Sequence, residues 1–131
     1  MAERTVSAVW EEGLRCSVDA GGFPLTVDEP TSVAGGTGRG PQPTELLLAS
    51  VSSCFTLAVA HSAAKRDLDL RGLRVDATGT YDGPRFVAIR ITVHADAPQG
   101  EELARLITAA ERVCYVTNTL RLAPEIEIRS A

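Results

Sequence analysis

Apolar and polar residues alternate along the first part of the chain. Over residues 5–28, apolar positions recur at every second residue, and the runs break at Glu12-Gly13 and Gly21-Gly22. Such alternation puts one apolar face on a strand, and glycine-containing pairs are typical of tight turns. The pattern therefore predicts a three-stranded meander. Residues 29–43 follow with four glycines and three prolines, which favours a functional or mobile loop.

The next segment, residues 44–64, predicts a long helix with an unusual surface. Pro43, Thr44 and Glu45 suit a helix start, because proline is tolerated in the first turn and an acid favours the positive end of the dipole. No charged residue occurs from Leu46 to Ala64, so the helix has no face suited to water and should be buried all round. A chain of 131 residues can hardly cover it alone. We therefore expect a homodimer in which a second subunit covers part of the helix.

The remaining pattern predicts a hairpin followed by short helices. Residues 70–81 and 86–95 alternate on either side of a strong turn, Asp82-Gly83-Pro84. Residues 101–112 have apolar positions at helical spacing, with acids first and arginine last. Residues 113–122 predict a second brief helix, and Ile126 and Ile128 predict a closing strand. Strands segregated from helices indicate an α+β fold, and the length indicates a single domain over residues 1–131.

Composition narrows the class of protein. The chain is 44% apolar and 23% charged with a net charge of −4, which excludes collagen-like and disordered classes. An acidic chain argues against a nucleic-acid partner. The uncharged helix contains too many hydroxyl side chains for a typical membrane span, and no signal peptide is visible at the start. We expect a cytoplasmic protein that does not enter the membrane.

The candidate chemistry lies in three cysteines, Cys16, Cys54 and Cys114. Three are too few for a secreted disulfide framework, and with two histidines they lack the spacing of a metal site. Cys16 alternates with apolar neighbours and is interpreted as core packing. Cys54, in the middle of the uncharged helix, is either a small buried apolar group or a reactive thiol. If the turn after Cys114 is helical, its free N–H groups would lower the pKa of that thiol.

Two blocks around these cysteines resemble the signatures of the OsmC/Ohr family. Residues 43–54, PTELLLASVSSC, resemble the family's first block, in which P-x-E-L-L-L-A precedes a cysteine. Residues 114–120, CYVTNTL, resemble its second block, C-P-V-S-N-x-L. The resemblance covers nearly the whole chain and implies an intertwined α+β homodimer, with an N-terminal meander, a buried central helix, a hairpin and a second amphipathic helix.

The resemblance also implies an activity, a thiol-dependent peroxidase that reduces organic hydroperoxides in oxidative-stress defence. The resemblance implies that Cys54 is the peroxidatic thiolate and that Cys114 resolves its sulfenic acid as a disulfide. It also implies that a dithiol or a lipoylated protein reduces this disulfide to two thiols. The chemistry requires no metal and no organic cofactor. It does require a cation beside the thiolate, for which Arg39 and Arg15 are the candidates, and an acid to orient that cation.

The chain departs from the best-characterised branch of the family at two positions. That branch has glutamate directly after the proline, where this chain has Thr44. Glu45 is the candidate acid one residue later, a rotation of about 100° on a helix. Tyr115 replaces the proline that usually follows the second cysteine. The pattern is closer to the less-studied OsmC-like branch.

Three functions are therefore compatible with the sequence. The first is the peroxidase. The second is a non-catalytic binding protein that keeps the fold and its cavity for an apolar small molecule. The third is a redox sensor whose cysteines oxidise but turn over slowly.

Overall fold

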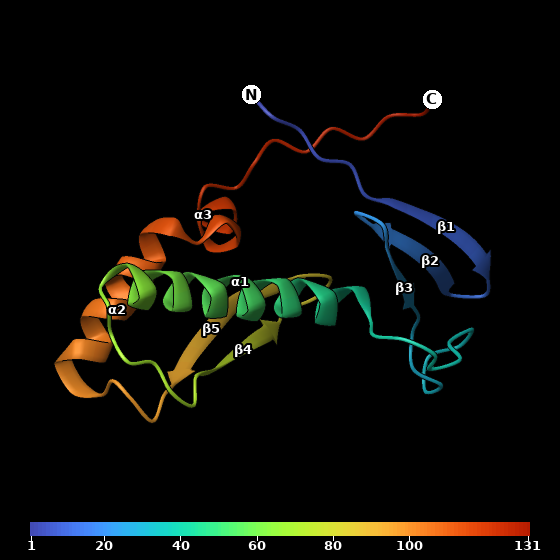
Figure 1. Ribbon diagram of the computed structural model, residues 1–131. Helices are drawn as coiled ribbons and strands as arrows, with labels where there is room; N and C mark the ends of the chain where they lie inside the picture. The colour runs from blue at the N-terminus through green and yellow to red at the C-terminus, as the bar shows by residue number, and fades with distance from the viewer. The chain divides into compact units, whose positions relative to one another are not determined.

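The computed structural model describes residues 1–131 as two compact units, Met1–Leu47 and Leu48–Ala131 (Figure 1). The chain contains five strands and three helices in the order β1, β2, β3, α1, β4, β5, α2 and α3. This composition confirms the α+β class predicted from the periodicity of apolar residues.

The first unit contains the predicted meander. Its strands β1 (Ser7–Glu12), β2 (Arg15–Ala20) and β3 (Phe23–Val27) form an antiparallel sheet in the order β1-β2-β3. Gly21 and Gly22 link β2 to β3 with positive φ angles of 66° and 90°, a backbone conformation that residues with a Cβ atom rarely adopt. Large apolar side chains stay exposed on this sheet, including Trp10 at 72% and Phe23 at 74%.

The glycine-rich segment between β3 and α1 is tied down by backbone hydrogen bonds. Gly38 N–H donates to the carbonyl of Glu29, and Asp28 N–H donates to the carbonyl of Pro41, over 2.9 and 3.1 Å. Gly40 lies so close to β3 that a Cβ atom there would collide with the carbonyl oxygen of Thr26. This segment is therefore an ordered loop packed along the edge of its own sheet, and glycine is required where the backbones meet.

The long helix α1 (Pro43–Lys65) begins in the first unit and continues through the second. Its own chain buries it along one stripe only. The buried residues are Val51, Phe55, Ala58, Val59, Ser62 and Ala63. By length and composition α1 could cross a membrane, and one third of its most apolar stretch is buried. The single chain thus covers α1 on one side only, in line with the expectation that 131 residues cannot wrap this helix completely.

The second unit packs α1 against a hairpin and a second helix. Strands β4 (Arg74–Tyr81) and β5 (Phe86–His94) form the predicted antiparallel hairpin, with Val75 opposite Val93 and Ala77 opposite Ile91. Helix α2 (Gly100–Val113) follows, and the brief helix α3 (Tyr115–Arg121) ends the regular structure. The buried cluster of this unit is formed by side chains of α1, β4 and α2, together with Cys114. Its members are Phe55, Ala58, Val59, Ala63, Val75, Leu106, Ala110 and Cys114.

The closing strand predicted at Ile126 and Ile128 is wrong for the single chain. Residues 123–131 form no strand and pair with none, and the two isoleucines are 79% and 92% exposed. A strand is stable only where a neighbouring edge accepts its backbone hydrogen bonds. Alternation of side chains indicates a segment suited to pairing, whereas the presence of an edge to pair with depends on distant parts of the chain.

Candidate functional site

The structure brings Cys54 and Cys114 together, although sixty residues separate them in the sequence. Cys54 lies on α1, is half-buried and packs against the buried cluster that contains Cys114. Cys114 lies at the junction of α2 and α3 and has no exposed surface. The Cys54 thiol donates a hydrogen bond to the Cys114 sulfur. Two free thiols in direct contact inside a core are well placed to exchange a proton or to form a disulfide.

Several donors converge on the Cys114 sulfur and change its acidity. Burial alone raises the pKa of this thiol, because a charged sulfur is poorly solvated there. The Thr117 side chain, whose hydroxyl also donates to the Cys114 carbonyl over 3.3 Å, lowers this pKa. The backbone N–H groups of Thr117 and Val116 and the Cys54 thiol act in the same direction. Together they outweigh burial, and the pKa of Cys114 falls below its ordinary value. The expectation that a helical turn after Cys114 would lower its pKa agrees with this arrangement.

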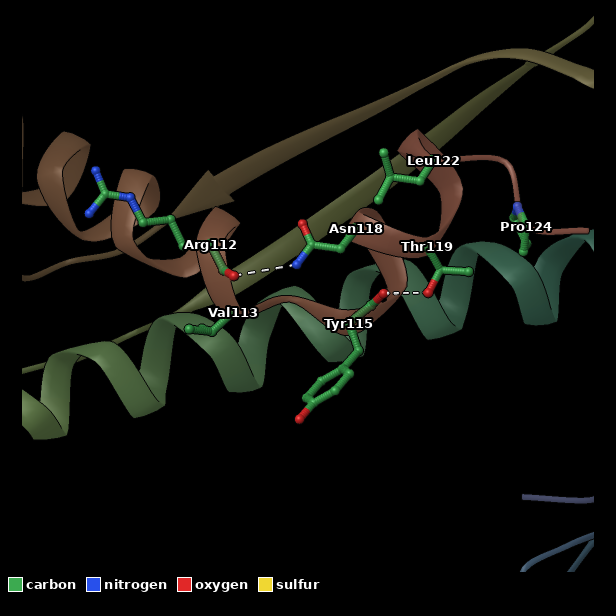
Figure 2. A pocket seen from close by; sticks show the side chains of 7 residues that line it. All are labelled: Arg112, Val113, Tyr115, Asn118, Thr119, Leu122 and Pro124. Carbon is green, nitrogen blue, oxygen red and sulfur yellow. Dashed lines mark hydrogen bonds between the residues drawn. The ribbon is translucent and has the colours of Figure 1, made fainter. Parts of the chain in front are cut away.

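The turn that carries Cys114 is held from both sides. Asn118 N–H donates to the Cys114 carbonyl over 3.0 Å, and the Asn118 side chain donates to the carbonyl of Arg112 over 3.3 Å (Figure 2). Thr119 donates to the carbonyl of Tyr115 over 2.7 Å. These bonds close the junction between α2 and α3 over a shallow hollow of 570 Å³. They hold the sulfur of Cys114 against the core and away from solvent.

A second hollow, of 230 Å³, is lined by neighbours of the two cysteines rather than by the cysteines themselves. Phe55, next to Cys54 in the chain, and Thr117, a donor to Cys114, both line it. The rest of its wall is apolar except for Glu111 and Arg121. The apolar members are Ile89, Ile91, Val93 and Ile107. An apolar hollow of this size next to a thiol pair can accept the alkyl part of a small organic molecule.

The other predicted site residues lie in the first unit. Glu45 accepts a hydrogen bond from the backbone N–H of Gln42 over 2.9 Å. Gln42 is the residue before α1, and its carbonyl accepts the N–H of Leu46. Glu45 therefore caps the start of α1 through the glutamate bond of a capping box, whereas the Gln42 side chain bonds to Glu29. This structural role is established by geometry, whereas its catalytic role stays a prediction.

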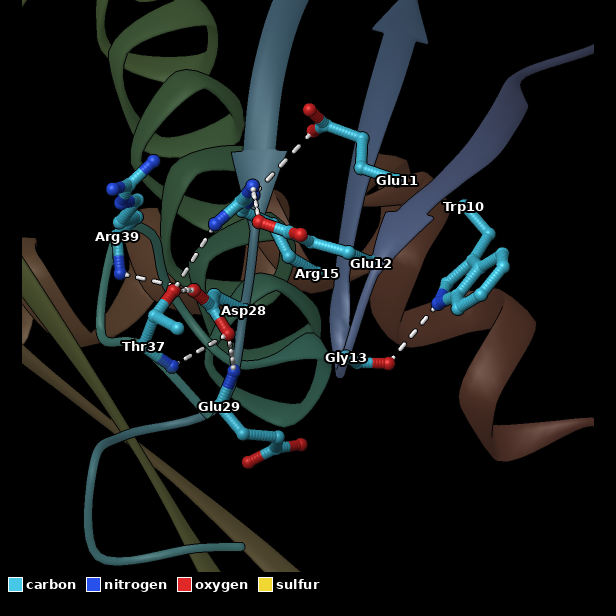
Figure 3. A network of polar contacts seen from close by, with 9 residues as sticks. All are labelled: Trp10, Glu11, Glu12, Gly13, Arg15, Asp28, Glu29, Thr37 and Arg39. Carbon is cyan, nitrogen blue, oxygen red and sulfur yellow. Dashed lines mark hydrogen bonds and ion pairs between the residues drawn. The ribbon is translucent and has the colours of Figure 1, made fainter. Parts of the chain in front are cut away.

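Arg39 and Arg15 differ in how their charges are used (Figure 3). Arg15 donates to Glu12 over 2.9 Å and to the hydroxyl of Thr37 over 3.3 Å, and it lies 3.9 Å from Glu11. Its charge is thus used to hold the first unit together. The side chain of Arg39 is exposed and has no ion-pair partner, while its backbone N–H donates to Asp28 over 3.2 Å. Of the two candidate cations, Arg39 is the one free to act on another group.

Sequence reasoning missed Asp28, the most connected carboxylate in the structure. Asp28 has no exposed surface and accepts hydrogen bonds from the Thr37 hydroxyl and from the backbone N–H groups of Glu29, Thr37 and Arg39 (Figure 3). The Thr37 hydroxyl contributes most, and together these donors outweigh burial and lower the pKa of Asp28 to about 2. No motif signals this role, because the donors are one hydroxyl and three backbone N–H groups of a loop that closes only in three dimensions.

No cluster of metal-ligating side chains exists in the structure. Cys16 is half-buried on β2 opposite Trp10 and Val27. His61 is exposed, two turns beyond Cys54 on α1. The pair Cys54 and Cys114 is the candidate site on which the proposed function rests.

Comparison with known proteins agrees with this fold and with the placement of the cysteine blocks. The family model described as OsmC-like protein matches residues 36–129, which include both cysteines of the pair. The chain belongs to the OsmC-like protein family.

Individual relatives of this OsmC-like protein extend over nearly the full chain. A protein of Haloferax volcanii is 28% identical over 125 residues, which cover 92% of this chain and 89% of the relative. The crystal structure of an OsmC-like protein from Mycoplasma pneumoniae superposes with a TM-score of 0.76 at 19% identity, over 93% of this chain and 89% of the other. An organic hydroperoxide resistance protein from Legionella pneumophila gives 0.68 at 20% identity, over 92% and 90%. These structures establish the fold.

Proposed function

We propose that this OsmC-like protein is a thiol-dependent peroxidase that reduces organic hydroperoxides through Cys54 and Cys114. The observation that carries the proposal is the direct contact of the two thiols beside an apolar hollow. A structural cysteine pair has no need of converging donors that favour a thiolate. The existence of organic hydroperoxide resistance proteins among the structural neighbours supports the same reaction class.

In the proposed reaction, Cys54 first gives up its thiol proton, and the resulting thiolate attacks the terminal oxygen of R–O–O–H. The O–O bond breaks, the alkoxide takes a proton and leaves as the alcohol, and Cys54 becomes a sulfenic acid. The thiolate of Cys114 then attacks the Cys54 sulfur, the S–O bond breaks, and hydroxide leaves as water after protonation. The peroxide has received two electrons, and the cysteines have become a disulfide.

Each residue has a distinct part in this scheme. Cys54 is the half-buried sulfur that a substrate can reach, whereas Cys114 is fully buried and suited to the second, intramolecular attack. The donors around Cys114 lower the pKa of its thiol, which favours the thiolate needed for that attack. Arg39, whose charge is unpaired, is proposed as the cation that stabilises the peroxidatic thiolate. Glu45 is proposed as the acid that orients this cation, in addition to capping α1.

The apolar hollow supports a preference for alkyl hydroperoxides over hydrogen peroxide. Burying alkyl groups against isoleucine and phenylalanine is favourable by about 25 cal/mol per Å², a gain that hydrogen peroxide cannot obtain. A dithiol, free or carried as a lipoyl group on a protein, is the proposed reductant of the disulfide. We propose a cytoplasmic location, where a disulfide formed in catalysis is readily reduced again.

We also propose that the protein acts as an intertwined homodimer. Leu57 projects from the uncovered side of α1 with 69% of its surface exposed. In the first unit, Val9, Trp10 and Phe23 are each more than 60% exposed on the meander. Soluble monomers seldom leave that much large apolar surface uncovered. A second copy that covers these faces would bury Leu57 and more of the uncharged stretch of α1 than one chain can cover.

Oxidation by one equivalent of an alkyl hydroperoxide tests the function. We expect an intramolecular Cys54–Cys114 disulfide, seen as a loss of about 2 Da in the intact mass, and steady turnover when a dithiol is present. Cys54→Ser should abolish peroxide consumption, while Cys16→Ser should leave it unchanged and so controls for the loss of a thiol. A Cys54→Ser protein that consumes the peroxide at the wild-type rate would refute the proposal.

The same experiment separates the alternatives. A slow redox sensor would form the disulfide in a single turnover but would not cycle with dithiol. A binding protein would show no change of mass, and an apolar ligand would raise its melting temperature.

A further inference from the structure

A groove lined by cations lies where the end of α1 meets α2, outside the proposed peroxide site. It consists of two adjoining hollows of 320 and 390 Å³ that share Arg66 and Arg112. Arg105 lines one hollow, and His61, Lys65 and Val113 line the other. Their remaining lining residues are alanine, serine and threonine. We call this surface the basic groove.

The charge of the basic groove is opposite to that of the whole protein. Four permanent cations line it without one carboxylate, although the chain carries a net charge of −4. Neither Lys65 nor Arg112 has an ion-pair partner, and Arg105 pairs only with the exposed Glu101 over 3.2 Å. Helix dipoles favour a cation at the end of α1 and of α2. They do not account for Arg105 in the middle of α2, nor for the absence of acids.

The basic groove adjoins the cysteine pair through two segments of chain. Val113 lines the groove and directly precedes Cys114. On α1, His61 and Lys65 follow Cys54 by seven and eleven residues, which places all three on one face, about 10 and 16 Å apart along the axis. A partner bound in the groove would therefore lie on the face of α1 that carries Cys54.

We propose that the basic groove is the docking surface for an acidic protein that carries the dithiol reductant. The inference rests on the proposed function, because only a redox-active Cys54–Cys114 pair needs such a partner. An acidic protein is repelled by the chain as a whole and attracted by this one surface, which steers it to the cysteines. Of the possible anionic partners, an acidic dithiol protein is favoured, since the surface leads to the disulfide.

The chemistry of reduction fits this position. A thiolate of the reductant attacks the sulfur of Cys54, the half-buried member of the pair, and the S–S bond breaks. Cys114 leaves as a thiolate, which its hydrogen-bond donors stabilise. The second thiol of the reductant then attacks the mixed disulfide and releases Cys54. Two electrons and two protons pass from the reductant, which becomes a disulfide, to the two cysteines.

The test measures how fast matched peptides reduce the disulfide, formed beforehand with a general thiol oxidant. Two peptides share one Cys-x-x-Cys core, flanked by glutamates in one and by lysines in the other, and dithiothreitol is the uncharged reference. At low salt we expect the wild type to react about tenfold faster with the acidic peptide. The difference should shrink at high salt.

Reversing the charge of two arginines in the basic groove tests whether the groove is the source of the preference for the acidic peptide. Arg66→Glu with Arg112→Glu should reverse the preference between the peptides and leave the rate with dithiothreitol unchanged, which shows that the fold and the disulfide are intact. Arg85→Glu with Arg90→Glu on the hairpin changes the net charge equally and should keep the preference.

Three results would overturn the docking proposal. These are equal rates with both peptides, a preference that survives reversal in the groove, and a preference that is lost equally on reversal in the hairpin. Failure of the peroxidase proposal is distinguishable, because then alkyl hydroperoxide forms no disulfide while the oxidant-formed disulfide still shows the charge preference. A pair that no oxidant can join would refute both.

Discussion

Replacement of Leu57 by alanine tests whether a second subunit covers α1. Leu57 is 69% exposed in the single chain, so the substitution should cost the isolated subunit less than about 0.5 kcal/mol. Complete burial of a leucine contributes about 1.5–3 kcal/mol, and roughly two thirds of it, about 1–2 kcal/mol per subunit, remains to be gained in a dimer. Two subunits together give about 2–4 kcal/mol, which corresponds to about 30- to 700-fold in the dissociation constant.

Analytical ultracentrifugation over a range of concentrations measures this constant. Leu106→Ala serves as the comparison for a leucine already buried within one subunit. Leu106 is 1% exposed, so its truncation should cost about 3–5 kcal/mol of folding stability. Leu122→Ala, at a residue 83% exposed beyond α3, is the matched surface substitution and should weaken the dimer less than Leu57→Ala does. A wild-type monomer at micromolar concentration, or a dimer that Leu57→Ala leaves unchanged, would refute the reasoning.

Two further predictions concern the polar networks. Because the pKa of Asp28 lies at about 2 in the folded chain, below its ordinary value of 3.8, its stabilising effect is complete above pH 4 and is lost as pH falls towards 2. Asp28→Asn should flatten the pH dependence of urea unfolding in that window, and an unchanged slope would contradict the assignment. Thr117→Val removes a donor to the Cys114 sulfur and should slow disulfide formation after a peroxide pulse by about threefold to tenfold at neutral pH. Quenched-flow mass spectrometry measures the rate, and Thr117→Ser should restore it.

The sequence predicted the helices and strands that are determined by residues close together in the chain. The meander, the hairpin, α2 and α3 follow from periods of two and 3.6 residues and from glycine or proline at the turns, all within a few positions of each other. The candidate cysteines were also recognisable, because each lies in a short block that resembles a family signature. Glu45 could be found in the same block, but not its capping bond to Gln42.

The features that the sequence did not predict all depend on contacts between residues far apart in the chain. The alternation at Ile126 and Ile128 indicated a strand, but no edge accepts it in the single chain. Asp28 escaped notice because its four donors come from residues up to eleven positions later, in a loop closed by its own hydrogen bonds. The absence of charge on α1 predicted burial, and only the packed structure showed which stripe the chain covers and which side it leaves open.

By itself, then, the sequence determined the α+β class, most element types and the choice of candidate cysteines. The tertiary structure alone decided that Cys54 meets Cys114, that Cys114 is the buried sulfur whose pKa falls, and that cations from two helices form one groove. The physical reason is distance along the chain. Periodicity and capping act within a turn or a hairpin, whereas contact, burial and electrostatic fields depend on which remote segments the packing of α1, β5 and α2 brings together.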